Sequence, residues 1–215
     1  MGFRQMISGK RFNRNLRRKQ NARPKNVPVE IAQTRITRAK RLAHTDKFVI
    51  RIGKFDKSKP VRFLDVGCCP MLDGAPTTRT TKEAFRKAGF EMDVTAVDKF
   101  FPEDFKPTDS KIKYETKDIS KSVPKGKFDF VRAANIFEYI KGEENVARAK
   151  GNIFNAVNEG GIIVMDALGK VLPEFGHKVV RGAGLVVLKK VNGKIIFVKY
   201  IDTQSFYRSR RAGYI

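Results

Sequence analysis

From residue 60 onward, short hydrophobic runs alternate with longer amphipathic stretches. The two amphipathic stretches predict helices, one opening with the capping-box pattern Thr80-x-x-Glu83 and stopping at Gly89, the other spanning about 143–157. Strands alternating with helices indicate parallel pairing in a doubly wound α/β sheet. The runs that have the length and composition of buried strands are residues 61–66, 92–97, 112–116, 128–133 and 162–165.

The pattern changes near the C-terminus. Two alternating segments, 185–191 and 195–200, flank Asn192-Gly193, which is the strongest short signal for a β-hairpin. The sequence therefore predicts a mostly parallel seven-stranded sheet that closes with an antiparallel hairpin.

The first 60 residues lack this regular alternation. Residues 1–28 are polar and rich in Arg and Asn, and we expect a basic arm that is disordered until it binds a partner. Residues 29–59 carry a weaker helical pattern with a basic face and predict a helical extension. The expected organisation is thus an arm (1–28), an extension (29–59), an α/β domain (60–203) and a basic aromatic tail (204–215).

Charge separates the ends from the middle. The net charge is +23, and residues 1–60 hold 18 Lys/Arg against 3 Asp/Glu. Residues 61–177 hold 18 of each, whereas residues 178–215 hold 9 against 1. A neutral core with basic ends favours contact with a polyanion, with a targeting segment as the alternative for the N-terminus.

Cysteine and histidine offer little chemistry. Cys68 and Cys69 are adjacent, and His44 and His177 are isolated, so we expect neither a disulfide framework nor a metal site. No hydrophobic run has the length of a membrane span, and no secretory signal is visible. We expect a soluble cytoplasmic protein, with the mitochondrial matrix or the nucleolus as alternatives.

Polar residues close several of the predicted strands. Asp65, Asp98 and Asn135 end the first, second and fourth strands, and Asp118 follows the third. Ligands of open α/β sheets bind beyond the carboxyl ends of the strands. These side chains are therefore candidates for binding.

The same segments resemble the class I S-adenosylmethionine-dependent methyltransferases. The run 63–68 (FLDVGC) resembles their first motif, 94–98 (VTAVD) the second and 117–119 (KDI) the third. Residues 128–131 with 135–140 are similar to the fourth strand and its following segment, and 158–164 to the turn into the fifth strand. The resemblance covers roughly residues 60–167.

This resemblance implies S-adenosylmethionine as the cofactor. Asp98 would accept the ribose hydroxyls, Asp118 the adenine amino group with Ile119 against the ring, and Gly67 would lie near the amino-acid portion. The implied cofactor-binding set is Asp65, Gly67, Cys69, Asp73, Gly74, Asp98, Lys99, Asp118, Ile119 and Asn135.

The first loop departs from the family pattern. Cys69 stands where the family commonly has a third glycine, and the loop from Pro70 to Pro76 is longer than usual. Its residues either cover the cofactor or obstruct the pocket. A nicotinamide enzyme would need Gly-x-Gly-x-x-Gly after the first strand, which is absent.

The motifs do not single out one methyl acceptor. The segment 132–135 (RAAN) lacks the Asn/Asp-Pro-Pro-aromatic motif of adenine and glutamine N-methyltransferases, and it holds no cysteine for cytosine C5 chemistry. Transfer by proximity needs little acid–base help. If a side chain assists, the candidates are Asn135, Glu138 and Tyr139, with packing in the core as the alternative for Tyr139.

The basic ends favour RNA as the acceptor, with ribosomal RNA or a ribosome-associated step preferred. The alternatives are an inactive methyltransferase-like protein that binds RNA or helps ribosome assembly, and a methyltransferase acting on proteins or small molecules. The expected RNA-binding residues are Arg11, Arg14, Arg17, Arg18, Lys19, Arg23, Arg38, Arg41, Arg208, Arg210 and Arg211.

Overall fold

The computed structural model describes residue 42, residues 44–68, 76–167, 171–175 and 184–202. All of them belong to one unit, Ala39–Ile215. The expected arm, the tail after Asp202, and the loop residues Cys69, Asp73 and Gly74 lie outside the described residues, as do the eleven expected RNA-binding positions.

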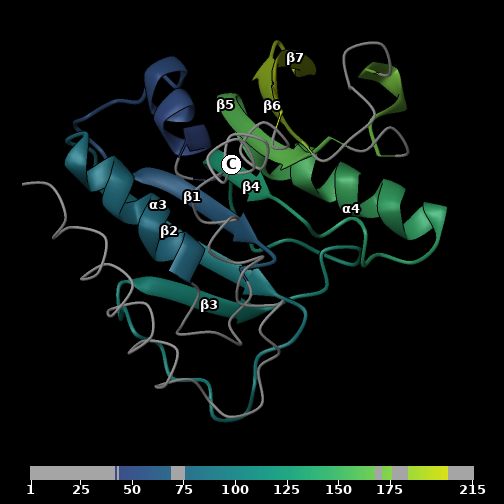
Figure 1. The fold of residues 1–215 in the computed structure, drawn as a ribbon, viewed down its shortest axis with the longest axis horizontal. Coiled ribbons are helices and arrows are strands. Elements are labelled where there is room, and N and C mark those ends of the chain that lie inside the picture. Colours follow the sequence, from purple (N-terminus) through teal and green to yellow (C-terminus); the bar gives the residue numbers. More distant parts are fainter. Residues whose placement is uncertain (1–41, 43, 69–75, 168–170, 176–183, 203–215) are drawn as a thin grey trace, which may run out of the picture. The chain divides into compact units, whose positions relative to one another are not determined.

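One seven-stranded sheet organises the domain. Its order is β3-β2-β1-β4-β5-β6-β7, and Figure 1 shows the strands following one another in this order. β1 to β5 pair in parallel, whereas β6 and β7 are antiparallel to their neighbours. The strands are β1 (Val61–Val66), β2 (Met92–Asp98), β3 (Ile112–Thr116), β4 (Phe128–Ala133), β5 (Val157–Asp166), β6 (Gly184–Val191) and β7 (Lys194–Asp202).

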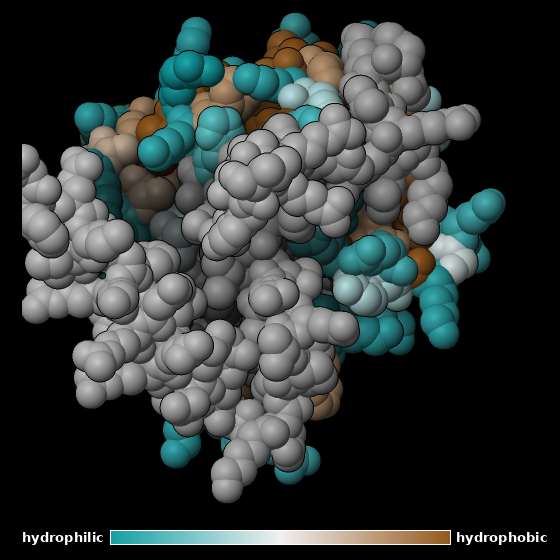
Figure 2. Space-filling view, viewed as in Figure 1, coloured by the Kyte–Doolittle hydropathy of each residue, from teal (hydrophilic) through white to brown (hydrophobic). Residues whose placement is uncertain are grey.

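Helices cover both faces of this sheet. α4 (Glu143–Ala156) buries Val146, Ala149 and Ile153 against one face. On the other face lie α3 (Pro76–Lys87) and a helix over residues 44–52, which contribute Phe85 and Val49 to a second core. Where α4 is visible in Figure 2, its surface is mostly hydrophilic. The predicted doubly wound fold is confirmed.

The alternation along β1 explains the two cores. Val61 and Phe63 belong to the core beneath α3, and Leu64 and Val66 to the core beneath α4. Successive side chains of a strand point to opposite faces, so a strand covered on both sides reads as nearly continuous apolar sequence.

The turn residues behave as their types require. Asn192 and Gly193 have φ of 52° and 73°, the left-handed pair that a two-residue hairpin needs. Gly89 ends α3 with φ of 81°, and its N–H donates to the Arg86 carbonyl.

Two local predictions were wrong. α3 begins at Pro76, so Thr80 and Glu83 lie inside it and form no capping box, and Glu83 instead accepts hydrogen bonds from Arg86. Proline suits the first turn of a helix because its missing N–H has no partner there. Residues 158–161 were predicted as a turn, but they belong to β5, whose pairing with β4 carries an irregularity between Phe128 and Phe130.

The helix over residues 44–52 packs on the sheet although the sequence placed it in an extension. Leu42 and Val49 are buried in the core beneath α3, and Thr81 of α3 donates a hydrogen bond to Asp46 at 2.8 Å. No helix of the described residues is long and apolar enough to cross a membrane.

Candidate cofactor site

The strand order reverses between β1 and β4, and the carboxyl ends of β1 to β5 share one edge of the sheet. A crevice at such a switch point is where ligands of open α/β sheets bind. Gly67, Asp98, Asp118 and Asn135 all follow or end strands at this edge. The parallel pairing therefore gathers the sequence-predicted residues that the structure describes.

Gly67 lies close to the segment that follows β4. It has φ of 72°, and a Cβ added to it would lie 2.2 Å from Cγ2 of Ile136, in the segment after β4. Its N–H donates to the Val97 carbonyl at 2.8 Å, and the Cys68 N–H donates to the same oxygen at 3.2 Å. Glycine is required both by the backbone conformation and by this approach of the two loops.

Asp98 ends β2 half-buried. Its Oδ1 accepts a hydrogen bond from the Phe100 N–H at 3.4 Å, and its carbonyl accepts one from the Lys117 N–H at 2.8 Å. A carboxylate at this position is chemically suited to accept hydrogen bonds from hydroxyl donors.

Asp118 is more strongly engaged. The Ser120 hydroxyl and N–H donate to its Oδ1 at 2.7 and 3.1 Å, and Lys99 Nζ lies 3.1 Å from its Oδ2. The Ser120 hydroxyl and the Lys99 charge lower the pKa of Asp118 to about 2. Asp118 is therefore a turn-forming carboxylate, and its neighbour Ile119 is buried in the core beneath α4.

Asp65 is buried beneath the edge. Arg132, its partner across β1 and β4, donates from Nε to Oδ1 at 2.9 Å and from Nη2 to Oδ2 at 2.6 Å, and Thr78 of α3 donates to Oδ2 at 2.5 Å. Arg132 lies within β4 and is 1% exposed, so its guanidinium does not face a substrate. Burial opposes the charge of Arg132, but the Asp65 carboxylate holds the pKa of Arg132 above its usual value.

Asp46 adds a second carboxylate to this buried group. Its Oδ1 lies 3.8 Å from Arg132 Nη1 without a hydrogen bond, while its Oδ2 accepts from Thr81. Burial raises the pKa of Asp46 to about 6, against the attraction of Arg132. The network joins the helix over residues 44–52 to β1, β4 and α3.

Asp166 is a site residue that the sequence patterns did not single out. It ends β5 buried, and its two oxygens accept hydrogen bonds from the N–H groups of Asn135 at 2.5 Å and Ile136 at 3.0 Å. Burial raises the pKa of Asp166 although these donors oppose the shift. The sequence did contain a signal for Asp166, because an acidic residue directly follows a predicted strand. The same signal identified Asp98.

The three candidate catalytic residues lie in the segment that Asp166 holds. Asn135 has φ of 57°, a left-handed conformation that asparagine tolerates better than most residues. Glu138 is exposed and Tyr139 is 76% exposed, in the turn that closes with the Tyr139 N–H bound to the Ile136 carbonyl. Tyr139 therefore does not pack in the core.

Comparisons with known proteins give distant likenesses. No protein-family model matches the chain, and no curated protein matches it. Among solved structures, the chain is similar to the N-methyltransferase NodS from Bradyrhizobium japonicum WM9, with 18% identity, TM-score 0.41, and coverage of 71% of this chain and 77% of that one.

Two further structures match at similar identity and TM-score. The complex of NodS with S-adenosyl-L-homocysteine matches at 19% identity and TM-score 0.42 over 71% of this chain and 69% of that one. TehB from Haemophilus influenzae matches at 17% identity and TM-score 0.40 over 58% of this chain and 39% of that one. Likenesses at this distance do not assign a function to this chain.

Proposed function

We propose that this chain is an S-adenosylmethionine-dependent methyltransferase whose acceptor is RNA. The observation that carries the proposal is the position of Asp98, half-buried at the carboxyl end of β2 and one strand away from Gly67 at the switch point. Carboxylates accept strong hydrogen bonds from hydroxyl groups, so Asp98 is suited to a ribose diol.

The described residues fit such a cofactor. Gly67 lies beside Ile136 at the point where the first motif turns away from the sheet, and its backbone would contact the amino-acid portion of the cofactor. Asp98 would hold the ribose, and Lys99 with Asp118 would border the base. Bound S-adenosylmethionine supplies an activated methyl group on a sulfonium.

The chain's own contribution to transfer is orientation. Asp166 fixes the N–H groups of Asn135 and Ile136, and thereby the turn that presents Glu138 and Tyr139 at the same edge. Holding the acceptor in line with the methyl group lowers the barrier without a dedicated base.

The choice of RNA rests on charge. The net charge is +23, and both ends of the chain are basic while the middle is neutral. Basic segments bind phosphates and release counterions, and this favours nucleic acid over an uncharged small molecule as the acceptor.

One observation favours a second candidate, an RNA-binding protein without transferase activity. Both Asp65 oxygens are bound by Arg132, and the N–H groups of Gly67 and Cys68 are bound by the Val97 carbonyl. These groups of the first motif are therefore already engaged within the protein.

Transfer of a tritiated methyl group from S-adenosylmethionine to total RNA tests the proposal. The wild type and Asp93→Ala should label RNA, while Asp98→Ala should lose at least about tenfold in activity. Asp93 is a matched control because it is an exposed aspartate of the same strand. Labelling of protein or small molecules in place of RNA would show that RNA is not the methyl acceptor.

A further inference from the structure

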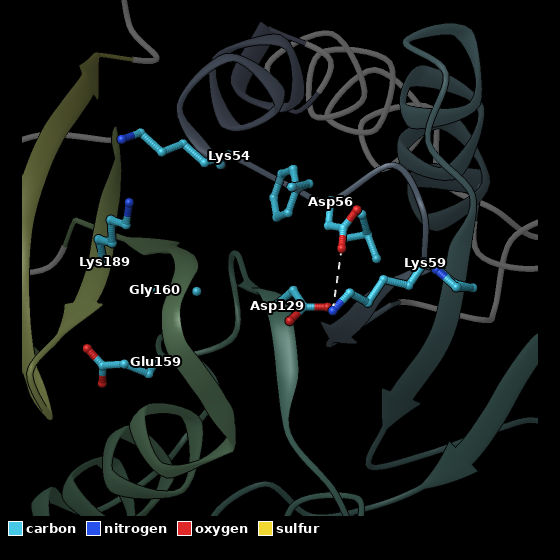
Figure 3. A pocket seen from close by; sticks show the side chains of 12 residues that line it. Lys54, Asp56, Lys59, Asp129, Glu159, Gly160 and Lys189 are labelled. Carbon is cyan, nitrogen blue, oxygen red and sulfur yellow. Dashed lines mark ion pairs between the residues drawn. The ribbon is translucent and has the colours of Figure 1, made fainter.

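A cavity of about 370 Å³ lies at the amino ends of the parallel strands, whereas Asp98 lies at their carboxyl ends. The loop 53–60 forms one wall, and the amino ends of β1, β4 and β5 form the floor (Figure 3). Lys189, near the end of the antiparallel strand β6, completes it. This cavity is thus separate from the candidate cofactor site.

The carboxylates that line the cavity are all bound by the protein. Asp129 accepts the Arg62 N–H at 2.9 Å and the Asn158 amide at 2.6 Å, one on each oxygen. Glu159 accepts the N–H groups of the hairpin residues Asn192 and Gly193, again one on each oxygen.

The third carboxylate, Asp56, is engaged in the same way. Its Oδ1 accepts from Ser58, and its Oδ2 lies 3.4 Å from Lys59 Nζ. All three carboxylates therefore have protein donors and fix the loop, the strand ends and the hairpin.

Two lysines of the cavity differ from them. The amino groups of Lys54 and Lys189 have no hydrogen bond or ion pair with any described residue, yet both side chains line the same cavity. Figure 3 shows their amino groups on the same side of it, one from the loop and one from β6. The donors available to a ligand are thus cationic, and an anion with several acceptor oxygens suits them.

The backbone of Lys54 has a strained conformation. Lys54 has φ of 46°, a left-handed conformation that residues with a Cβ adopt rarely. The next residue, Phe55, packs its ring against Phe85 and Phe90 with centroids 5.4 and 5.9 Å apart. This anchoring fixes the strained turn, and such strain is concentrated at functional sites.

Cations continue from the cavity along the neighbouring elements. Arg51 lies one turn before Lys54 in the chain, with its guanidinium 5.2 Å from the centroid of the Phe48 ring. Lys199 of β7 has its Nζ 4.8 Å from the same centroid. Several cations on neighbouring elements suit a ligand with repeated phosphates better than a single small anion.

We propose that this cavity binds one phosphate of a single-stranded RNA backbone between Lys54 and Lys189, while Arg51 and Lys199 contact adjacent phosphates. The inference rests on RNA as the partner in the proposed function. The six residues of β1 separate this edge from the candidate cofactor site by roughly 20 Å, so one RNA strand can reach both.

Binding of a fluorescein-labelled 12-nucleotide uridine RNA to the full chain, followed by anisotropy over a KCl series, tests the site. The variant is Lys54→Gln/Lys189→Gln, and the matched control is Lys106→Gln/Lys125→Gln, two exposed lysines that do not line the cavity. Both double variants lose the same charge, and circular dichroism verifies that each is folded.

The cavity variant should bind RNA at least about fivefold more weakly at 100 mM KCl, with a salt slope reduced by about 0.7 for the one phosphate lost. The control should stay within about twofold of the wild type. Equal losses in the two double variants would overturn the site, as would wild-type protein that binds vesicles of anionic phospholipid but not the RNA.

Calorimetric titration of the same variants with S-adenosylhomocysteine separates this inference from the proposed function. A cavity-specific loss of RNA affinity in a chain that never binds the cofactor would support the phosphate site and refute the enzyme. Normal cofactor binding with no cavity-specific loss would refute the phosphate site alone.

Discussion

Arg132 and Asp65 form a two-pronged ion pair in the interior of the domain, with distances of 2.9 and 2.6 Å, on directly paired positions of β4 and β1. Both side chains lie on the face covered by α3, and the guanidinium carbon is 5.2 Å from the centroid of the Phe63 ring. The pair fixes the end of β1, which is part of the first motif. It therefore supports the candidate cofactor site without facing it.

Replacing Arg132 should therefore be severely destabilising. Arg132→Met leaves two carboxylates, Asp65 and Asp46, buried without a cation, and we expect a loss of about 3–5 kcal/mol in the free energy of unfolding. Arg148→Met, which removes an exposed pair with Glu144, should cost at most about 0.5 kcal/mol. Urea denaturation measures both, and similar losses for the two variants would contradict the buried network.

Asp46 should make stability depend on pH. Its pKa of about 6 in the folded state lies above the usual aspartate value of 3.8, so the folded protein binds more protons here than the unfolded chain. The stabilising contribution is complete below about pH 4 and is lost as the pH rises through 6. Asp65, Arg132 and Thr81 are the polar groups that face it.

Asp46→Asn should remove this dependence. Between pH 4 and 7 the wild type should lose up to about 3 kcal/mol relative to the variant, because a tenfold difference in proton affinity between the folded and unfolded states is worth about 1.4 kcal/mol. Chemical denaturation of both proteins over this pH range gives the difference directly. A difference that does not vary with pH would show that Asp46 titrates normally.

Gly67→Ala should destabilise the protein more than the same substitution at another glycine with a positive φ. The new Cβ would lie 2.2 Å from Ile136, whereas at Gly160, which has φ of 76°, it would meet nothing within 4 Å. Gly160→Ala should cost only the left-handed strain, about 1–2 kcal/mol, and Gly67→Ala more than that. Thermal denaturation should also show partial rescue by adding Ile136→Ala, and equal effects at the two glycines would refute the contact.

Lys54→Gly should separate stability from RNA binding. Glycine relieves the left-handed backbone at φ of 46°, so the free energy of unfolding should exceed that of Lys54→Ala by about 1 kcal/mol. Both variants lose the amino group and should bind RNA equally weakly. Higher stability with undiminished RNA affinity would remove Lys54 from the proposed phosphate site.

Local signals predicted much of this fold. Hydrophobic runs located all seven strands, and Asn192-Gly193 located the hairpin, because each depends on residues close in sequence. The capping box at Thr80 was wrong because Pro76 starts the helix one turn earlier. Residues 158–161 contain the glycines of a turn, yet pairing with β4 draws them into β5.

The site was predictable only in outline. The parallel direction of the strands predicts that the aspartates gather at their carboxyl ends. It does not predict which side chains bind these aspartates. Asp65 meets Arg132 across 67 positions of sequence, and only the sheet register brings them together. The two lysines of the cavity at the amino ends of the strands were missed for the same reason, since Lys54 and Lys189 come from opposite ends of the domain.

Calorimetric titration with S-adenosylmethionine and S-adenosylhomocysteine tests the central claim most directly. The methyltransferase proposal predicts micromolar binding by the wild type and by Asp93→Ala, and at least about a tenfold loss in Asp98→Ala. If the folded wild type bound neither compound, the methyltransferase proposal would be contradicted, and the domain would be left as a candidate RNA-binding protein.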